Sequence, residues 1–143
     1  MTTGFTGGCL CGGIRCKTTS GPQLGADCQC EDCRKSSGSG HCSHLVVAAE
    51  AMSIEGQPTR FDKPADSGNM VSRFFCGSCG APVYSTNSGM PEIMFPRASS
   101  LDDPEIFTPS MIVYTSRAPS WDVVDAALPA FEGMPPDIPL EQG

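Results

Sequence analysis

The sequence predicts a mainly β protein built from short strands, and three observations lead to this prediction. The chain of 143 residues contains 16 glycines and 13 prolines but one tryptophan, a composition that favours many turns over long helices. Apolar and polar side chains alternate with a period of two in several segments, as in half-buried strands. Closely spaced cysteines stand at the ends of such segments, where a metal ion can join strand ends that are distant in sequence.

The chain length predicts one domain. A chain of this size buries about two-thirds of its unfolded surface in a single core. We expect one domain over residues 1–143, with a core over about 4–122 and a C-terminal tail, 123–143, that packs on the sheet. The last few residues are expected to be disordered.

Charge and hydropathy restrict the partners. The formal net charge is −7 and the basic residues form no run, so a surface that binds nucleic acid is not expected. No window approaches the roughly 18 apolar residues of a membrane span, and the N-terminus lacks the pattern of a secretory signal. We therefore expect a cytoplasmic protein without a membrane partner; the sequence does not indicate an oligomeric state.

The N-terminal half contains the first expected elements. Residues 14–19 alternate as a half-buried strand, with Cys16 as a small core residue. A short helical turn is expected after Cys33, a strand over 41–47 and one helical turn over 48–52. Residues 53–56 and 59–62 are predicted to form a short hairpin, followed by an exposed loop over 63–69.

The C-terminal half contributes further strands at 70–75, 82–85, 92–95 and 111–114. Ser100 is expected to cap a single helical turn. Beyond residue 120 the chain is rich in Pro, Ala and acidic residues. It is expected to lie over the sheet through Trp121, Leu128 and Phe131.

Four cysteines in two distant pairs predict a structural metal site. Cys9 and Cys11 are flanked by glycines, and Cys76 and Cys79 form a Cys-x-x-Cys pair between two predicted strands. Glycines allow the tight turns that aim backbone amides at the sulfurs. Because nine cysteines is an odd number and no secretory signal is present, zinc ligation is expected rather than disulfides.

Three further cysteines predict a second zinc site. Cys28, Cys30 and Cys33 lie within six residues, which supplies three corners of a tetrahedron. The fourth corner decides the role of the site, because a protein ligand makes it structural and an open position permits chemistry. His41, Cys42 and His44 alternate along the next strand, with Cys42 expected to face away from the histidines, and any of them could close the site.

Charged side chains follow the third cysteine of this set. Arg34 and Lys35 could attract the carboxylate of a substrate, donate hydrogen bonds to the thiolates or simply be solvated. The spacing does not choose among these roles.

The ordered motifs resemble the glutathione-dependent formaldehyde-activating enzyme family, which includes the centromere-protein-V-like proteins. The motifs are Gly8-Cys9-Leu10-Cys11-Gly12, Cys28-x-Cys30-x-x-Cys33-Arg34-Lys35 and Phe75-Cys76-x-x-Cys79-Gly80. Leu101-Asp102-Asp103-Pro104, Ser116-Arg117-Ala118-Pro119-x-Trp121 and Met134-Pro135-Pro136 are similar to C-terminal motifs of the family. Position 29 is Gln where the family usually has His, and Gln cannot act as an acid or base.

The resemblance implies a β-tent fold with two zinc ions. It implies a structural zinc on Cys9, Cys11, Cys76 and Cys79, and a catalytic zinc with an open position on Cys28, Cys30 and Cys33. It also implies a carbon-sulfur lyase that interconverts S-hydroxymethylglutathione with glutathione and formaldehyde. In this interpretation a small thiol is deprotonated on the metal, with Glu31, Asp32, His41 and His44 as candidates to move the proton.

One other function remains open, and the sequence argues against a second. A non-catalytic zinc-stapled binding module would have both zinc sites structural. A methionine sulfoxide reductase of a related zinc-bearing fold would need a redox-active cysteine in the C-terminal strands, but no cysteine follows Cys79.

Overall fold

The computed structural model describes residues 3–135 and is mainly β, as the sequence predicts. Strands β1 (Thr6–Gly8), β2 (Arg15–Thr18) and β5 (Met52–Glu55) form a small antiparallel sheet in the order β1-β2-β5. A seven-stranded sheet has the order β10-β3-β4-β9-β8-β7-β6. Its strands are β3 (Leu24–Cys28), β4 (Cys42–Ala48), β6 (Thr59–Pro64), β7 (Met70–Phe75), β8 (Pro82–Asn87), β9 (Ile93–Pro96) and β10 (Met111–Val113).

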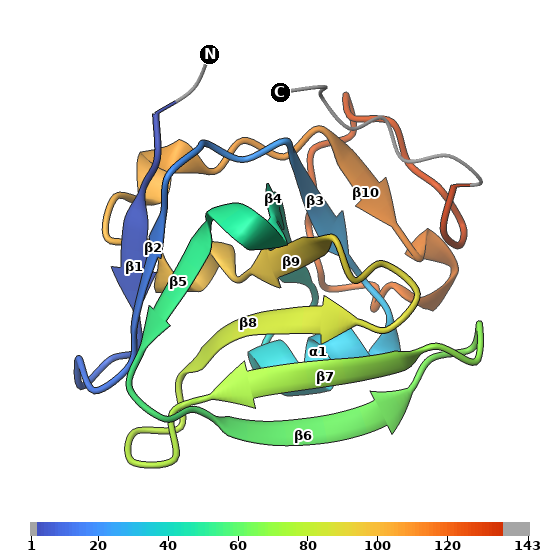
Figure 1. Cartoon of the computed structure of the whole chain (residues 1–143). Coiled ribbons are helices and arrows are strands. Elements are labelled where there is room, and N and C mark those ends of the chain that lie inside the picture. The colour runs from blue at the N-terminus through green and yellow to red at the C-terminus, as the bar shows by residue number, and fades with distance from the viewer. Residues whose placement is uncertain (1–2, 136–143) are drawn as a thin grey trace.

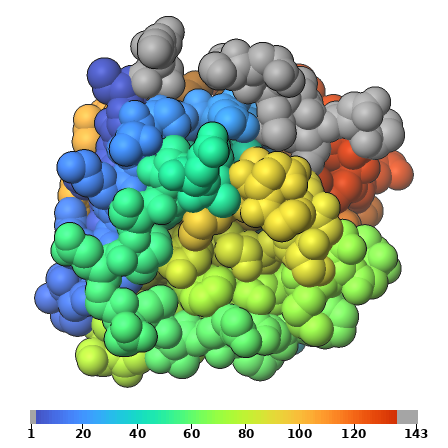
Figure 2. All heavy atoms as spheres, viewed as in Figure 1, coloured from blue at the N-terminus to red at the C-terminus, as the bar shows by residue number. Residues whose placement is uncertain are grey.

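The two sheets lie at an angle to each other (Figure 1). The small sheet stands at the left of the view, β6 to β8 cross the lower front, and β3 and β10 lie at the upper right. The strand pairs are antiparallel except β10 with β3, which run parallel. The atoms of β5 to β8 and of the β8–β9 connection form much of the face in Figure 2, in green to yellow.

Helical segments are short. Helix α1 (Glu31–Ser37) begins at Cys30, whose sulfur accepts a hydrogen bond from the Cys33 amide, and it ends at Gly38 in the left-handed conformation. The helical turn was predicted to follow Cys33, whereas the helix begins before this cysteine and includes it. The 3-10 turn η1 (Ala49–Ala51) confirms the turn predicted over 48–52. The other 3-10 turns are η2 (Ala98–Ser100), η3 (Pro104–Ile106) and η4 (Thr115–Arg117).

The core follows the predicted alternation. On β2, Cys16 and Thr18 are buried while Lys17 is exposed, and Cys16 packs with Val83 of β8 between the two sheets. On β4, an interior strand of the larger sheet, Leu45 and Val47 are both 0% exposed. Burial of one such aliphatic side chain stabilises the fold by about 1.5–3 kcal/mol. This core fixes β3, β4 and β7, the strands that border the candidate sites.

The predicted hairpin between residues 53–56 and 59–62 is wrong. β5 pairs with β2 instead, and β6 pairs with β7. Ile54 packs against the buried cluster around Cys16, so burial favours the small sheet. Gly56, with φ of 92°, turns the chain away from β5 toward the larger sheet.

Two C-terminal expectations are also wrong. Trp121 is 65% exposed rather than packed on the sheet. The cap of a C-terminal turn is Asp103, whose side chain accepts a hydrogen bond from the Glu105 amide, whereas Ser100 lies inside η2. Phe131 does pack beside Met111 and Val113. The expected disorder of the last residues falls on positions 136–143, outside the described part of the chain.

Within residues 3–135, no helix is long and apolar enough to cross a membrane.

Candidate metal centres

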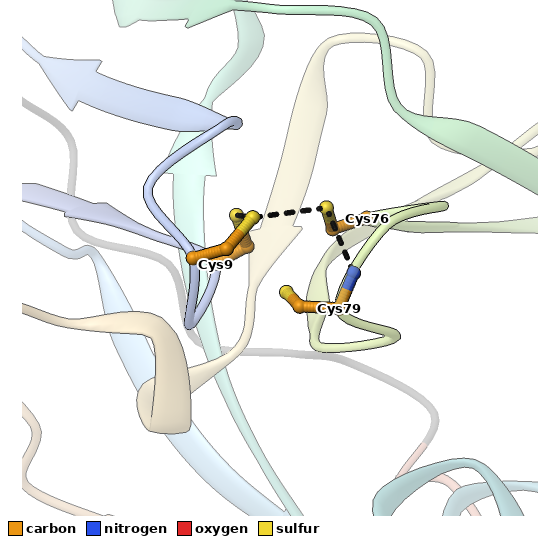
Figure 3. A group of neighbouring side chains, drawn as sticks. Cys9, Cys76 and Cys79 are labelled. Carbon is orange, nitrogen blue, oxygen red and sulfur yellow. Dashed lines mark hydrogen bonds between the residues drawn. The ribbon is translucent and has the colours of Figure 1, made fainter.

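The structure brings Cys9, Cys11, Cys76 and Cys79 together, with their sulfurs all within 4.8 Å of one another. Cys11 Sγ lies 3.7 Å from Cys9 Sγ and 3.7 Å from Cys76 Sγ. Four sulfurs about 2.3 Å from a tetrahedral zinc would lie roughly 3.8 Å apart, whereas a disulfide needs about 2.05 Å. The spacing therefore fits a metal ion, and these four residues are called the four-cysteine cluster (Figure 3).

Two similar turns build the four-cysteine cluster. Cys9 follows β1 and Cys76 follows β7, and each sulfur accepts a backbone N–H, from Ile14 at 3.2 Å and from Cys79 at 3.5 Å. Gly12 and Gly80 complete the turns with positive φ of 82° and 77°, a conformation that costs glycine little. The cluster thus connects an end of the small sheet to an end of the large one.

Backbone amides also favour thiolates here. The N–H groups of Ala81 and Cys11 lower the pKa of Cys79 to about 6. A thiol that ionises this readily is prepared to ligate a cation, because the thiolate is the ligand.

Cys28, Cys30 and Cys33 form a second group with sulfurs within 4.8 Å of one another, called here the three-cysteine cluster. Cys28 ends β3, Cys30 caps α1 and Cys33 lies in the first helical turn. Hydrogen bonds from the Cys28 and Cys30 thiols lower the pKa of Cys33, whereas hydrogen bonds with Cys30 and Cys33 raise the pKa of Cys28. A cation bound at this cluster would be ligated by thiolates, the form of cysteine that binds metals.

Two of the three candidates for a fourth ligand, Cys42 and His44, lie beside the three-cysteine cluster. His44 Nε2 is 3.4 Å from Cys33 Sγ, and His44 Nδ1 is 3.9 Å from Cys42 Sγ. Neither residue joins the group whose ligand atoms are mutually close. The expectation that Cys42 faces away from both histidines is wrong, because Cys42 and His44 are two residues apart on β4 and share a face, while His41 precedes the strand.

A pocket of about 590 Å³ opens onto the three-cysteine cluster. Cys28, Cys30, Cys33 and His44 line it, and no residue of the four-cysteine cluster does. Its apolar wall includes Leu24, Val46, Val71, Phe95, Met111 and Val113. The three-cysteine cluster therefore has access to a cavity large enough for a small molecule, and this pocket does not reach the four-cysteine cluster.

Tyr114 lies on the wall of this pocket in an unusual conformation. Its φ of 59° and ψ of 40° place a bulky residue in the left-handed region, where it begins η4. Such strained positions concentrate at functional sites.

A comparison with known protein families gives a match that covers the cysteine motifs. The family model for the glutathione-dependent formaldehyde-activating enzyme matches residues 4–117, which include all seven clustered cysteines. The chain belongs to this family. A curated relative from Halomonas elongata is 25% identical over 126 residues, covering 84% of this chain and 80% of the relative, and it has the provisional name glutathione-dependent formaldehyde-activating enzyme.

The four candidates for proton transfer form two pairs, one that lines the pocket and one that does not. Asp32 and His44 line the pocket, although Asp32 is bound by Lys63 Nζ at 2.7 Å. Glu31 forms an exposed pair with Lys35 at 2.9 Å, and His41 contacts Asp122 outside the pocket lining. His44 is thus the candidate that both reaches a cysteine and faces the cavity.

A buried polar network behind the three-cysteine cluster was not predicted from the sequence. Gln29 is 2% exposed and its Nε2 donates to Asp122 Oδ2 at 2.9 Å. His41 Nδ1 lies 2.9 Å from the same oxygen. At Gly40, a Cβ would lie 2.4 Å from Asp122 Cγ, so the close approach requires glycine. Only the position of Gln29 between two cysteines hinted at this network.

Proposed function

We propose that the protein is a zinc-dependent carbon-sulfur lyase that acts on an adduct of a thiol and a small aldehyde. By family membership, the adduct is S-hydroxymethylglutathione, formed from glutathione and formaldehyde. One observation supports a reaction site in this chain. The three-cysteine cluster borders the pocket and leaves one corner of a tetrahedron without a fourth close ligand among the described residues.

Both clusters suit zinc in their donor chemistry. Cysteine thiolates select zinc over hard cations such as magnesium, and four of them typically form a structural site. We assign a structural zinc to Cys9, Cys11, Cys76 and Cys79, and a catalytic zinc to Cys28, Cys30 and Cys33. A bound zinc supplies Lewis acidity that lowers the pKa of a thiol, without redox chemistry.

The chain's own residues would orient the adduct and handle its proton. In the lyase direction the carbon-sulfur bond breaks, the hydroxyl oxygen loses its proton and becomes the aldehyde carbonyl, and the sulfur keeps the electron pair. His44 lines the pocket, and its Nε2 lies 3.4 Å from Cys33 Sγ, so His44 is assigned to hold the proton on its way from oxygen to sulfur. The apolar wall would contact the rest of the substrate.

The test is exchange NMR between glutathione and S-hydroxymethylglutathione, because the uncatalysed reaction gives a baseline. We expect zinc-loaded protein to accelerate the exchange and Cys30→Ser to abolish the acceleration. Cys16→Ala is the matched control, because Cys16 is buried outside both clusters. A Cys30→Ser protein that has lost one zinc yet exchanges at the wild-type rate would refute the lyase assignment.

A non-catalytic binding module is the second candidate, and the 3.4 Å approach of His44 Nε2 to Cys33 Sγ favours it. If His44 completes the coordination, no corner remains for a substrate. Cobalt substitution separates the two functions. An open site changes its absorption spectrum when glutathione is added, and a closed site does not.

A further inference from the structure

The pocket of the three-cysteine cluster contains a basic side chain without a described carboxylate partner. Arg73 of β7 lines the pocket and is half-buried, and among residues 3–135 no carboxylate oxygen lies within 4.0 Å of its guanidinium. Arg117, also in the lining, is paired with Asp66 at 3.0 Å. Unlike Arg117 on the same pocket wall, Arg73 therefore has no carboxylate partner among the described residues.

The neighbours of Arg73 in the sheet do not neutralise its charge. Its partners in the sheet are Phe61 on β6 and Ser85 on β8, which are both uncharged. A partly desolvated guanidinium is costly unless an anion pairs with it, and its planar fork suits a carboxylate. In a chain of net charge −7, such a local cation can attract an anionic ligand that the rest of the surface repels.

A second arginine, Arg97, lies in the protein interior near the helix that carries Cys33. Arg97 is 2% exposed and also lacks a carboxylate within 4.0 Å in the described chain. Its backbone bridges to His44 on β4, and its Nη2 donates to Ser36 Oγ of α1 at 3.1 Å. Arg97 does not line the pocket, whereas Arg73 does.

We propose that Arg73 binds a carboxylate of the substrate while the substrate's sulfur lies at Cys28, Cys30 and Cys33. This inference rests on the proposed function and deepens it. It assigns the pocket to thiols that carry a carboxylate, and makes Arg73 the residue that distinguishes them from neutral thiols. The apolar residues around the pocket then contact the carbon chain between the two groups.

The experiment compares two thiols that differ in one group, 3-mercaptopropionate and 3-mercaptopropionamide. Each is titrated into cobalt-loaded protein, and the change in the cobalt absorption spectrum gives a dissociation constant. The ratio of the two constants is compared between wild type and Arg73→Met, so that the different acidities of the two thiols cancel. Arg60→Met is the matched control, because it removes an exposed arginine of the neighbouring strand that lies outside the pocket.

We expect Arg73→Met to reduce the preference for the carboxylate roughly tenfold or more, the usual effect of losing a charged hydrogen-bonded pair. Arg73→Lys should retain part of the preference, and Arg60→Met all of it. A count of two metals per chain shows that each variant is folded.

Two outcomes would overturn the proposal in distinguishable ways. If both thiols change the spectrum and Arg73→Met keeps the wild-type ratio, Arg73 is not the anchor while the open metal position stands. If neither thiol changes the spectrum of folded wild-type protein, the position is closed, and the carboxylate site fails together with the lyase assignment.

Discussion

The two cysteine clusters of this protein offer the same chemical groups but join the chain in different ways. The four-cysteine cluster joins turns that are distant in sequence, with Cys11 and Cys76 separated by 65 positions. The three-cysteine cluster draws all its sulfurs from the end of β3 and the start of α1. The first connects two sheets, and the second lies on the wall of a pocket.

The length of chain that each metal would close predicts a different role for each cluster, stability for the four-cysteine cluster and chemistry for the three-cysteine cluster. A metal that closes a long loop restricts the unfolded chain strongly, so its binding free energy becomes folding free energy. A metal that closes a six-residue segment restricts the unfolded chain little. Its affinity can instead serve the exchange of a ligand at a free corner. Such a division predicts that equivalent ligand substitutions in the two clusters have unequal effects on folding.

The largest expected effect comes from Cys76→Ser compared with Cys30→Ser. Cys76→Ser should release the metal of the four-cysteine cluster and lower the free energy of unfolding by on the order of 3 kcal/mol or more. Cys30→Ser should lower it by less than about 1 kcal/mol, because serine also caps the start of α1 well. Thermal unfolding with metal analysis measures both. Equal losses of stability would contradict the assignment of separate roles.

The sequence predicted the clusters because the ligands of each turn are close in sequence and glycines mark the turns. It also predicted β2 and β4 from their alternation. The error at Cys42 was one of register, since residues two apart on a strand face the same side. The pairing of β5 with β2 depends on which sheet buries Ile54, and local pattern does not contain that information.

The polar surroundings of the three-cysteine cluster could not be predicted for a related reason. Gln29 and Asp122 are 93 positions apart, and nothing in the local sequence pairs them. The lack of a described partner for Arg73 likewise follows from the packing of β6, β7 and β8. The sequence shows which residues could ligate a metal, but the tertiary fold decides which charges face the cavity.

An intermediate effect is expected from Asp122→Ala, which should weaken metal binding at the three-cysteine cluster and leave the four-cysteine cluster unchanged. Loss of this carboxylate removes the hydrogen bonds to Gln29 and His41 behind the three-cysteine cluster. Partners that orient metal ligands typically contribute tenfold or more to metal affinity. Competition with a chelator should therefore show about tenfold weaker binding of the second metal, with the first unchanged.

The control for this variant is Asp125→Ala in the same segment, where the carboxylate accepts only a local turn hydrogen bond from Ala127. It should leave both metal affinities at their wild-type values. Equal loss of both metals in Asp122→Ala would indicate general destabilisation instead of a role in orienting Gln29.

The smallest effect is expected at a polar contact that joins the same regions as the four-cysteine cluster. Asp102 binds Arg15 of β2 and accepts a hydrogen bond from Thr6 Oγ1 at 2.6 Å, so it ties the small sheet to the segment after η2. These donors lower the pKa of Asp102 from 3.8 to about 2. The folded pKa is depressed, so the contribution to stability is present above about pH 4 and is lost as the pH falls toward 2.

Asp102→Asn should lower the melting temperature by no more than about 3 °C at pH 7, because the two side chains of the ion pair are 40% and 45% exposed and solvent screens them. The backbone bonds between Thr6 and Asp102 and between Gly7 and Leu101 remain. The difference in melting temperature between wild type and variant should shrink with added salt. It should also shrink below pH 4, where any loss of metal affects both proteins alike. Asp62→Asn, in the exposed pair with Arg60, is the control and should change nothing measurable. If Asp102→Asn destabilised the protein as much as Cys76→Ser, the connection between the sheets would depend on this ion pair as much as on the metal.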